Sequence, residues 1–292
     1  MNRTKNLLFF ILSMVIFGTN GLIVANISLG SAEIVLMRTF LGSLFLLVIV
    51  LAKRSFSFAD LKSDLVPATI GGAALGLNWV LLFTAYRSAG VALSTLTYYC
   101  GPIIVLALSP VLFKEKLTWN KLLAIAAVAV GMFCISGNID PGSDVQTGLL
   151  CGGGAALLYA SLIVANKRVK RLAGLNCAMY ELIVAFFVVL IYLIVTNVPL
   201  PVIPAVGDIL WVLLIGLVNT GLAYYLYFSS LQQLPGQTIA LVCYIDPLTA
   251  LLVSAAFLGE KMLVVQIVGA VLILGGACLG ELKFKKSRNN LN

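Results

Sequence analysis

Three ionisable residues lie deep inside long apolar stretches of this 292-residue sequence, where charge is costly in a membrane. Asp246 lies near the middle of its stretch and directly precedes Pro247. Because proline has no N–H group, we expect the carbonyl of Cys243 to lack its helical partner. A carboxylate beside a broken helix can bind a proton, a cation or the amino group of a ligand. The alternative is a protonated aspartic acid that only donates a hydrogen bond to a neighbouring helix.

Arg38 and Glu181 are the other two, each about seven residues inside its stretch. Arg38 can hold a carboxylate of a ligand or gate an opening, or its side chain can extend to the nearby membrane surface. Glu181 has the same alternatives, with the basic run from Lys167 to Arg171 as candidate partners. Our candidates for coupling or gating are Asp246, Arg38, Glu181, Pro102 and Pro247.

Neutral polar and aromatic residues in the apolar stretches predict a ligand-binding cavity. At 100° per residue, Gln237 shares a helical face with Tyr244. Tyr244 and Asp246 are about 200° apart, so only one of them can face the cavity squarely. The candidate substrate-binding residues are Asn20, Asn78, Trp79, Tyr98, Tyr99, Tyr159, Asn219, Tyr224, Gln237 and Tyr244.

Several kinds of chemistry are excluded by what the sequence lacks. It has no histidine, which excludes mechanisms that depend on an imidazole. Its six cysteines occur singly in apolar stretches without CxxC spacing, so we interpret them as small apolar side chains. The patterns HExxH, GxSxG and GxxxxGK[ST] are missing. We therefore predict no catalytic residues, no metal site and no cofactor.

Composition indicates a membrane protein. Hydrophobic residues make up 61% of the chain and charged residues 10%, and the mean hydropathy is +1.08. A soluble domain is about a quarter charged, and a spanning helix needs about 20 apolar residues. We predict an all-α polytopic membrane protein with ten transmembrane helices and no extramembrane domain. The predicted spans are residues 7–28, 31–52, 65–87, 91–113, 118–137, 145–166, 174–195, 206–230, 235–258 and 263–281.

Basic residues predict the orientation of these spans. Nearly all of the 19 lysines and arginines fall in alternate loops and at the two ends of the chain. Because basic loops stay in the cytoplasm, we predict a multi-pass protein of the cell membrane with both termini cytoplasmic. The same residues are divided among short loops and form no stripe, so we expect no nucleic-acid partner.

The sequence contains two similar halves, residues 1–140 and 141–292. Pro102 and Glu115 recur 145 residues later as Pro247 and Glu260, and we expect both glutamates to cap the helix that follows them. Each half has five predicted spans, an odd number, so one half must be inverted relative to the other. Inverted repeats are typical of secondary transporters, whose halves exchange conformations and open one central site alternately to each side.

Two segments resemble the half signatures of the EamA family, in the drug/metabolite transporter superfamily. They are GPIIVLALSPVLFKEK around Pro102, and PLTALLVSAAFLGEK followed by QIVGAVLILGG from Pro247. The resemblance covers essentially the whole chain. It implies a ten-helix carrier of small metabolites, often amino acids that leave the cell, with a central cavity lined mainly by spans one to four and six to nine. One departure is Phe113-Lys114-Glu115, where the family commonly has Leu-Gly-Glu.

Together these features predict a secondary transporter that exports a small metabolite, such as an amino acid or amine, by alternating access. Its expected partners are this small-molecule substrate, the lipid bilayer, and a proton or cation as coupling ion. The sequence leaves open whether the protein is a monomer or a homodimer. One alternative is a membrane-embedded enzyme that acts on a lipid or small metabolite. Another is a structural or receptor-like membrane protein, which would not need inverted halves.

Overall fold

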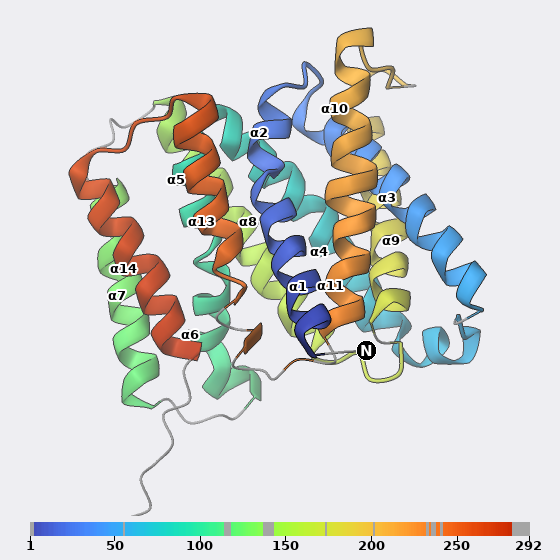
Figure 1. Cartoon of the computed structure of the whole chain (residues 1–292), viewed down its shortest axis with the longest axis horizontal. Coiled ribbons are helices and arrows are strands. Elements are labelled where there is room, and N and C mark those ends of the chain that lie inside the picture. Colours follow the sequence, from blue (N-terminus) through green and yellow to red (C-terminus); the bar gives the residue numbers. More distant parts are fainter. Residues whose placement is uncertain are drawn as a thin grey trace, which may run out of the picture.

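The computed structural model describes residues 3–54, 56–113, 118–136, 143–172, 174–200, 202–231, 234, 238–239 and 242–281, and these residues form helices without a strand (Figure 1). The helices of the first half are α1 (Arg3–Gly18), α2 (Asn20–Ala25), α3 (Ser31–Lys53), α4 (Phe58–Ala89), α5 (Val91–Tyr98), α6 (Gly101–Phe113) and α7 (Trp119–Ser136). Those of the second half are α8 (Asp144–Asn166), α9 (Leu175–Val195), η1 (Val206–Asp208), α10 (Ile209–Leu213), the π-helix η2 (Leu214–Leu222), α11 (Ala223–Leu231), α13 (Ile245–Val253), the π-helix η3 (Ser254–Leu258) and α14 (Val264–Glu281).

Seven helical segments of the described chain are long and apolar enough to cross a bilayer, and three further apolar helices are shorter. Each of these segments overlaps one of the ten predicted spans. The shorter ones are Trp119–Ile135, Ile245–Leu258 and Val264–Gly276. Large apolar side chains cover much of the outer surface, among them Leu51, Phe133 and Val195. The predicted all-helical membrane fold is therefore confirmed, although three of the helices are shorter than a full span.

The two repeated prolines stand where helices begin. Pro102 follows a break at Tyr99 and Cys100 that separates α5 from α6, and Pro247 lies in the first turn of α13. The carbonyl of Cys243 lacks its usual helical partner, the N–H four residues on, as expected, and it accepts instead from the N–H of Asp246 at 3.3 Å. A proline in the first turn removes an N–H group that has no helical acceptor. Both prolines therefore start a helix rather than kink a continuous one.

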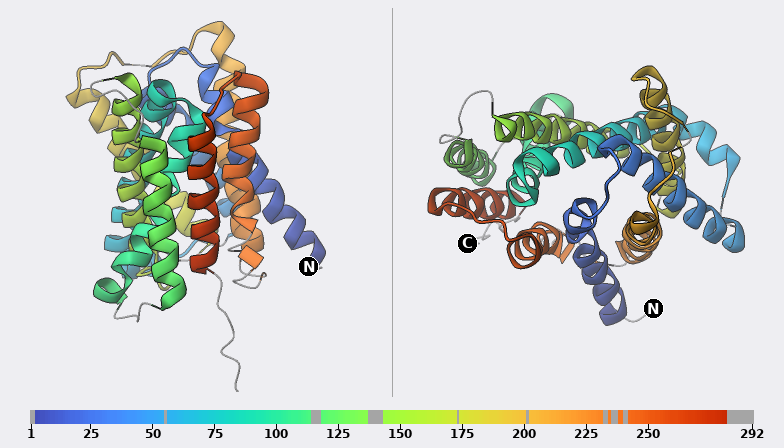
Figure 2. Two further views of the ribbon diagram at one scale, coloured as in Figure 1. Left: turned by 90° about the vertical axis from the view of Figure 1, so that its left-hand side faces the viewer. Right: turned by 90° about the horizontal axis from the view of Figure 1, so that it is seen from above.

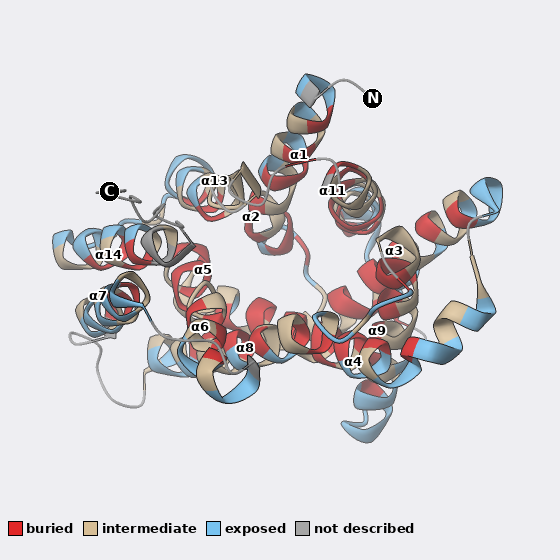
Figure 3. Cartoon of the chain, turned by 90° about the horizontal axis from the view of Figure 1, so that it is seen from below, coloured by how far each residue is buried: buried red, intermediate tan, exposed pale blue. Residues whose placement is uncertain are grey.

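The helices of the two halves intermingle. The first helices of the halves, α1 and α8, run in opposite directions (Figure 2). Seen along the helices, α1, α11, α3, α9, α4, α8, α5 and α13 follow one another in a ring, and α7 and α14 lie side by side at one end (Figure 3). The largest apolar core joins helices of both halves and includes Leu46, Phe83, Leu182 and Ile215.

Glycine allows the close approach of α7 and α14. A Cβ atom on Gly131 would lie 2.7 Å from the carbonyl oxygen of Gly269, and a Cβ atom on Gly269 would lie 2.7 Å from that of Gly131. Real Cβ atoms do not approach a carbonyl oxygen so closely. Small residues at such crossings are a general device of membrane helices, whose association depends on close packing rather than on the hydrophobic effect.

Two aspartates join the halves in matching ways. Asp208, at the end of η1, accepts hydrogen bonds from the N–H group of Ser28 at 3.0 Å and from its hydroxyl group. Asp64, at the kink of α4, accepts from the N–H groups of residues 170, 171 and 172 at 2.9, 2.5 and 2.8 Å. Asp64 and Asp208 are 144 residues apart in sequence, and Ser28 and Arg171 are 143 apart. The two contacts are thus related by the inverted repeat, and we call them the paired joints.

The Asp64 joint lies on the face of the molecule that carries Arg3, Lys53 and the loop from Lys167 to Arg171, which we call the basic face. Asp64 precedes the part of α4 predicted to span the membrane. The N–H of Leu172, followed by that of Arg171, lowers the pKa of the Asp64 carboxyl below its ordinary value, because hydrogen bonds to the charged form favour it.

A candidate substrate-binding cavity

A cavity of about 680 Å³ is lined by residues of both halves. Its walls come from α1 to α6, α8, α9, α11 and α13, which are the spans that the family resemblance implies. At one end the lining reaches Lys167, Val169 and Gly174 in the loop of the basic face. Among the described lining residues, none belongs to a loop of the opposite face. The cavity therefore extends toward the basic face.

Arg38 lies in the cavity wall and is only 1% exposed. Its guanidinium carbon is 3.7 Å from the ring centre of Trp79 and 5.1 Å from that of Phe83. Nε donates to the hydroxyl of Thr220 at 3.0 Å, while Nη1 is buried without a hydrogen-bond partner. The side chain therefore does not extend to the membrane surface. An arginine that retains an unbonded N–H group in a cavity can bind a carboxylate.

The π-helix η2 helps to place this arginine. The hydroxyl of Thr220 accepts from Arg38 and itself donates to the carbonyl of Ile215, five residues earlier, at 2.7 Å. A Cβ atom on Gly42 of α3 would clash with the Thr220 methyl group, so α3 and η2 pack closely. π-helical turns occur frequently at functional sites, and this one carries the acceptor that orients Arg38.

Glu181 lines the cavity toward the basic face and is 3% exposed. Its Oε1 atom is buried without a hydrogen-bond partner. A Cβ atom on Gly71 would clash with Oε1, so α4 passes close to this carboxyl group. Lys167, one of the candidate partners named from the sequence, lines the same cavity. The cavity thus has a basic residue in its wall and an acidic residue nearer its basic-face end.

Asp246, the third of the ionisable residues singled out from the sequence, also lines the cavity, at the start of α13. It accepts a hydrogen bond of 2.6 Å from the hydroxyl of Tyr99, which lies at the break between α5 and α6. The contact therefore joins the two halves at the positions where their fourth and ninth spans are interrupted. Tyr244 does not line the cavity but packs beside Leu96 and Ile103, so only Asp246 of this pair faces it.

Aromatic rings form much of the wall. Tyr98 stacks on Tyr159 with ring centres 4.8 Å apart, and Trp79 meets Tyr224 edge-on at 6.1 Å. Such walls suit a ligand that carries an apolar or aromatic group. The sequence candidates that line the cavity are Asn20, Trp79, Tyr98, Tyr99, Tyr159, Tyr224, Arg38, Glu181, Asp246 and Pro102.

Other candidates are placed elsewhere. Asn219 does not line the cavity, because its amide donates to the carbonyl of Ile16 at 2.7 Å and to the hydroxyl of Thr19 at 2.9 Å, joining η2 to the first span. Asn78 is fully buried outside the lining, with no partner for either amide atom. Pro247 is buried in α13, and Gln237 lies outside the described residues.

The sequence candidates missed several lining residues. Tyr86 lies seven residues after Trp79 on α4, and Cys177 precedes Glu181 by one turn on α9. Helical spacing from the sequence candidates is the signal that predicts both. Thr95, one turn before Tyr99, follows the same rule.

Glu260 joins the two halves on the face opposite the basic face. Its carboxylate accepts from the N–H groups of Val91 at 2.7 Å and Ala92 at 2.9 Å, and from the hydroxyl of Ser254 at 2.6 Å. The expectation that it caps the following helix is wrong, because it caps α5 of the other half. Gly90 makes room for it, with φ +80° and a Cβ position 2.8 Å from Oε1. Glu115 lies outside the described residues.

A helical membrane protein with one central cavity shared by two inverted halves has the architecture of a membrane transporter. The sequence pattern of the EamA-like transporter family matches residues 4–137 and 146–280, and the chain belongs to this family.

Its relatives are named as transporters. The chain is 27% identical to the uncharacterized transporter YxxF of Bacillus subtilis, with 92% of this chain and 87% of the relative covered. It is 26% identical to an uncharacterized transporter of Archaeoglobus fulgidus, with 92% and 93% covered, and 27% identical to Protein PecM of Dickeya dadantii, with 70% and 69% covered. A crystal structure with 17% identity has the same fold, with a TM-score of 0.66 over 96% of this chain and 98% of that one.

Proposed function

We propose that this transporter exports a small zwitterionic metabolite, such as an amino acid, or a related amine. The observation that supports this most strongly is the unbonded Nη1 of Arg38 in a cavity that also contains Glu181 and Asp246. A guanidinium group binds a carboxylate, and a carboxylate binds an ammonium group. The aromatic walls accommodate the apolar part of the same molecule.

Alternating access is the proposed mechanism. The cavity extends toward the basic face, and the Glu260 contact joins the halves on the other face. Exchange of conformations between inverted halves would open the opposite face and close the basic one. In this proposal the basic face is cytoplasmic, both termini are cytoplasmic, and the protein resides in the cell membrane. Asp246 is the proposed site for a coupling proton or cation, since the equivalent position in the first half is Gly101.

Counterflow in proteoliposomes tests the proposal. Purified protein is reconstituted, vesicles are loaded with a panel of unlabelled amino acids and amines, and uptake of the labelled compound is measured. We expect Arg38→Gln to raise the KM for carboxylate-bearing substrates at least tenfold and to leave amines without a carboxylate unaffected. Arg54→Gln, at an exposed arginine of the basic face, is the matched control. An unchanged KM in folded Arg38→Gln protein would refute the carboxylate role, and counterflow of none of the compounds would refute the substrate class.

The enzyme alternative has less support. Relatives from Bacillus subtilis and Archaeoglobus fulgidus are named as transporters. The reconstituted protein can be incubated with the same panel of compounds at equal concentration on both sides of the membrane. Mass spectrometry would then reveal whether any compound is converted.

A further inference from the structure

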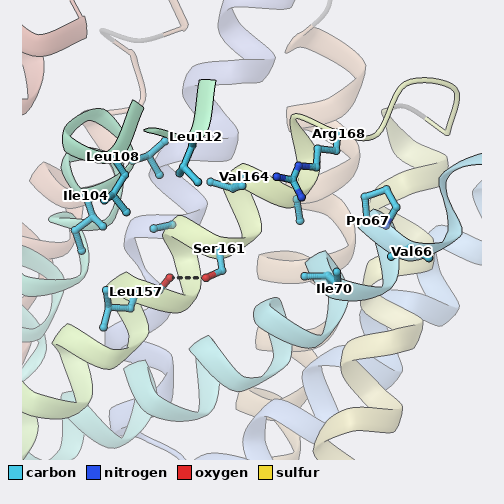
Figure 4. A pocket seen from close by; sticks show the side chains of 13 residues that line it. Val66, Pro67, Ile70, Ile104, Leu108, Leu112, Leu157, Ser161, Val164 and Arg168 are labelled. Carbon is cyan, nitrogen blue, oxygen red and sulfur yellow. Dashed lines mark hydrogen bonds between the residues drawn. The ribbon is translucent and has the colours of Figure 1, made fainter. Parts of the chain in front are cut away.

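A second cavity lies on the outside of the helix ring, between α4, α6 and α8 (Figure 4). It has a volume of about 510 Å³ and is lined by 13 residues, of which only Ser161 and Arg168 carry polar side chains. The hydroxyl of Ser161 donates to the carbonyl of Leu157 in its own helix at 3.0 Å. Apart from Arg168, the lining residues therefore have no polar side-chain group left without a hydrogen bond, which suits an apolar ligand.

This groove is separate from the central cavity. The two linings share no residue, because α8 presents Leu157, Ser161 and Val164 to the groove and Tyr159 and Leu162 to the cavity. Its rim is open to the surroundings. Exposed apolar side chains there include Leu157, Leu108, Val66 and Ile70. In a membrane protein such a surface faces the acyl chains of the bilayer.

The groove has the depth of one leaflet. Its α8 wall begins at Leu157, nine residues before α8 ends at Asn166, and nine residues of helix rise about 14 Å. Half of a hydrocarbon core of about 30 Å is about 15 Å. Arg168 lies at the end of this wall, where α8 gives way to the basic loop. A lipid with its chain in the groove would therefore place its headgroup beside Arg168.

We propose that the groove binds an acyl chain of an anionic phospholipid from the leaflet at the basic face, with its phosphate at Arg168. Lys170 and Arg171 follow in the same loop and add positive charge near the headgroup. The Asp64 joint holds the backbone of that loop in place. An uncharged headgroup would gain nothing from this cluster, so the site favours an anionic lipid.

The bound chain would contact α6 from outside. Ile104, Leu108 and Leu112 of α6 line the groove, while Pro102 at its start lines the central cavity. A lipid in the groove would thus pack against the outer side of α6, and the first turn of this helix lines the central cavity.

Quenching by brominated lipids tests the site. Trp119 and Trp211 are replaced by phenylalanine, Leu108→Trp is added as the probe, and the signal of the parent without the probe is subtracted. In vesicles, dibromo-phosphatidylglycerol should occupy the groove about fivefold more readily than dibromo-phosphatidylcholine, which is the effect of one basic residue near an anionic headgroup. Arg168→Gln should remove the preference and Arg168→Lys should retain it.

The matched control is Arg171→Gln, which removes the same charge from the same loop outside the groove lining. It should retain most of the preference. Equal quenching by the two lipids in the probe protein would overturn the proposal, as would a preference that survives Arg168→Gln.

The paired joints support a second inference, which uses different contacts from the lipid groove and rests on the proposed alternating access. We infer that the Asp64 and Asp208 contacts stay formed throughout transport and are not gates. Gates on opposite faces must open in turn, whereas the Asp208 and Asp64 contacts are both made in one structure. Each ties the first loop of one half to the third spanning helix of the other. The moving bodies would then each contain helices of both halves.

Cross-linking separates joints from gates. A short bifunctional maleimide is applied to Ser28→Cys with Asp208→Cys, and separately to Val91→Cys with Glu260→Cys, in cysteine-free protein that has measurable counterflow before cross-linking. We expect the first cross-link to leave counterflow within twofold and the second to abolish it. Loss of counterflow in the first would overturn the inference about joints while leaving the transport function intact. Absence of counterflow in the cysteine-free parent, which keeps both contacts, would instead count against the proposed function.

Discussion

Replacing Glu260 with glutamine tests the contact that joins the two halves on the face opposite the basic face. The two carboxylate oxygens accept from Val91 and Ala92 at 2.7 and 2.9 Å, and from Ser254 at 2.6 Å. Glu260→Gln keeps one acceptor oxygen and replaces the other with an NH₂ group, which cannot accept. At least one of the three hydrogen bonds to the charged group is therefore removed, and those that remain become weaker bonds to a neutral group.

The size of the effect follows from these bonds. A hydrogen bond to a charged group contributes about 1.5–3 kcal/mol, and Glu260 is half-buried, so we take the lower end, about 1.5–2 kcal/mol. If the contact exists only while this face is closed, its removal shifts the equilibrium toward the open state by that amount. Since about 1.4 kcal/mol corresponds to a factor of ten, the population open to this face should rise about 10–30-fold.

Cysteine accessibility measures this population. Thr95→Cys places a label in the cavity wall in a cysteine-free background, and a membrane-impermeant maleimide is added from the face opposite the basic face. Glu260→Gln should accelerate labelling at least tenfold. Glu33→Gln is the matched control, because Glu33 also accepts from a backbone N–H, that of Gly30, but within the start of its own helix. An unchanged rate in Glu260→Gln, or an equal acceleration in Glu33→Gln, would refute the reasoning.

Three further predictions concern the cavity, a joint and the helix crossing. Asp246→Asn should abolish the pH dependence of transport or the binding of a cationic substrate, and Tyr99→Phe should weaken the same coupling less; wild-type pH profiles in both would make Asp246 structural. Asp64→Asn should lower the Tm at pH 7. Because the folded-state pKa of Asp64 is lowered, this difference should shrink as the pH falls below about 4, where the unfolded carboxyl is protonated. Gly131→Ala should destabilise the protein by about 1–3 kcal/mol through overpacking, measured as a decrease in Tm, whereas Gly275→Ala, which meets nothing within 4 Å, should not.

The sequence predicted well the features that depend on apolar stretches, on the internal repeat and on helical spacing. The apolar stretches indicated the helical membrane fold, and the family resemblance is confirmed by matches over both halves. Arg38, Glu181 and Asp246 were chosen because charge is costly in a membrane, and the structure brings all three to one cavity. Angular differences along the helix also separated Asp246 from Tyr244 correctly.

The assignments that failed depend on hydrogen bonds between distant helices. Glu260 was assigned to the helix that follows it because capping is local, yet the backbone N–H groups that it caps lie about 170 residues earlier in the chain. Asn219 has the composition of a cavity residue, but the carbonyl of Ile16 is within reach of its amide. Neither partner leaves a signal in the spacing of nearby residues. A single sequence therefore cannot distinguish a polar side chain that binds a ligand from one that forms a hydrogen bond to another helix.

The symmetric scaffold and the asymmetric charges have different consequences for transport. If the halves were identical, exchanging their conformations would give two states of equal free energy, because every interaction broken on one face would form again on the other. The hydrogen bond between Tyr99 and Asp246 breaks this balance. With the repeat offset of 145 residues, Tyr99 corresponds to Tyr244 and Asp246 corresponds to Gly101. Because Gly101 has no carboxylate, the equivalent pair cannot form this bond. Under the proposed alternating access, the exchanged conformation would lack an equivalent of this hydrogen bond. A proton or an ammonium group at Asp246 would change the strength of that bond, so we expect this position to bias the exchange between the two conformations.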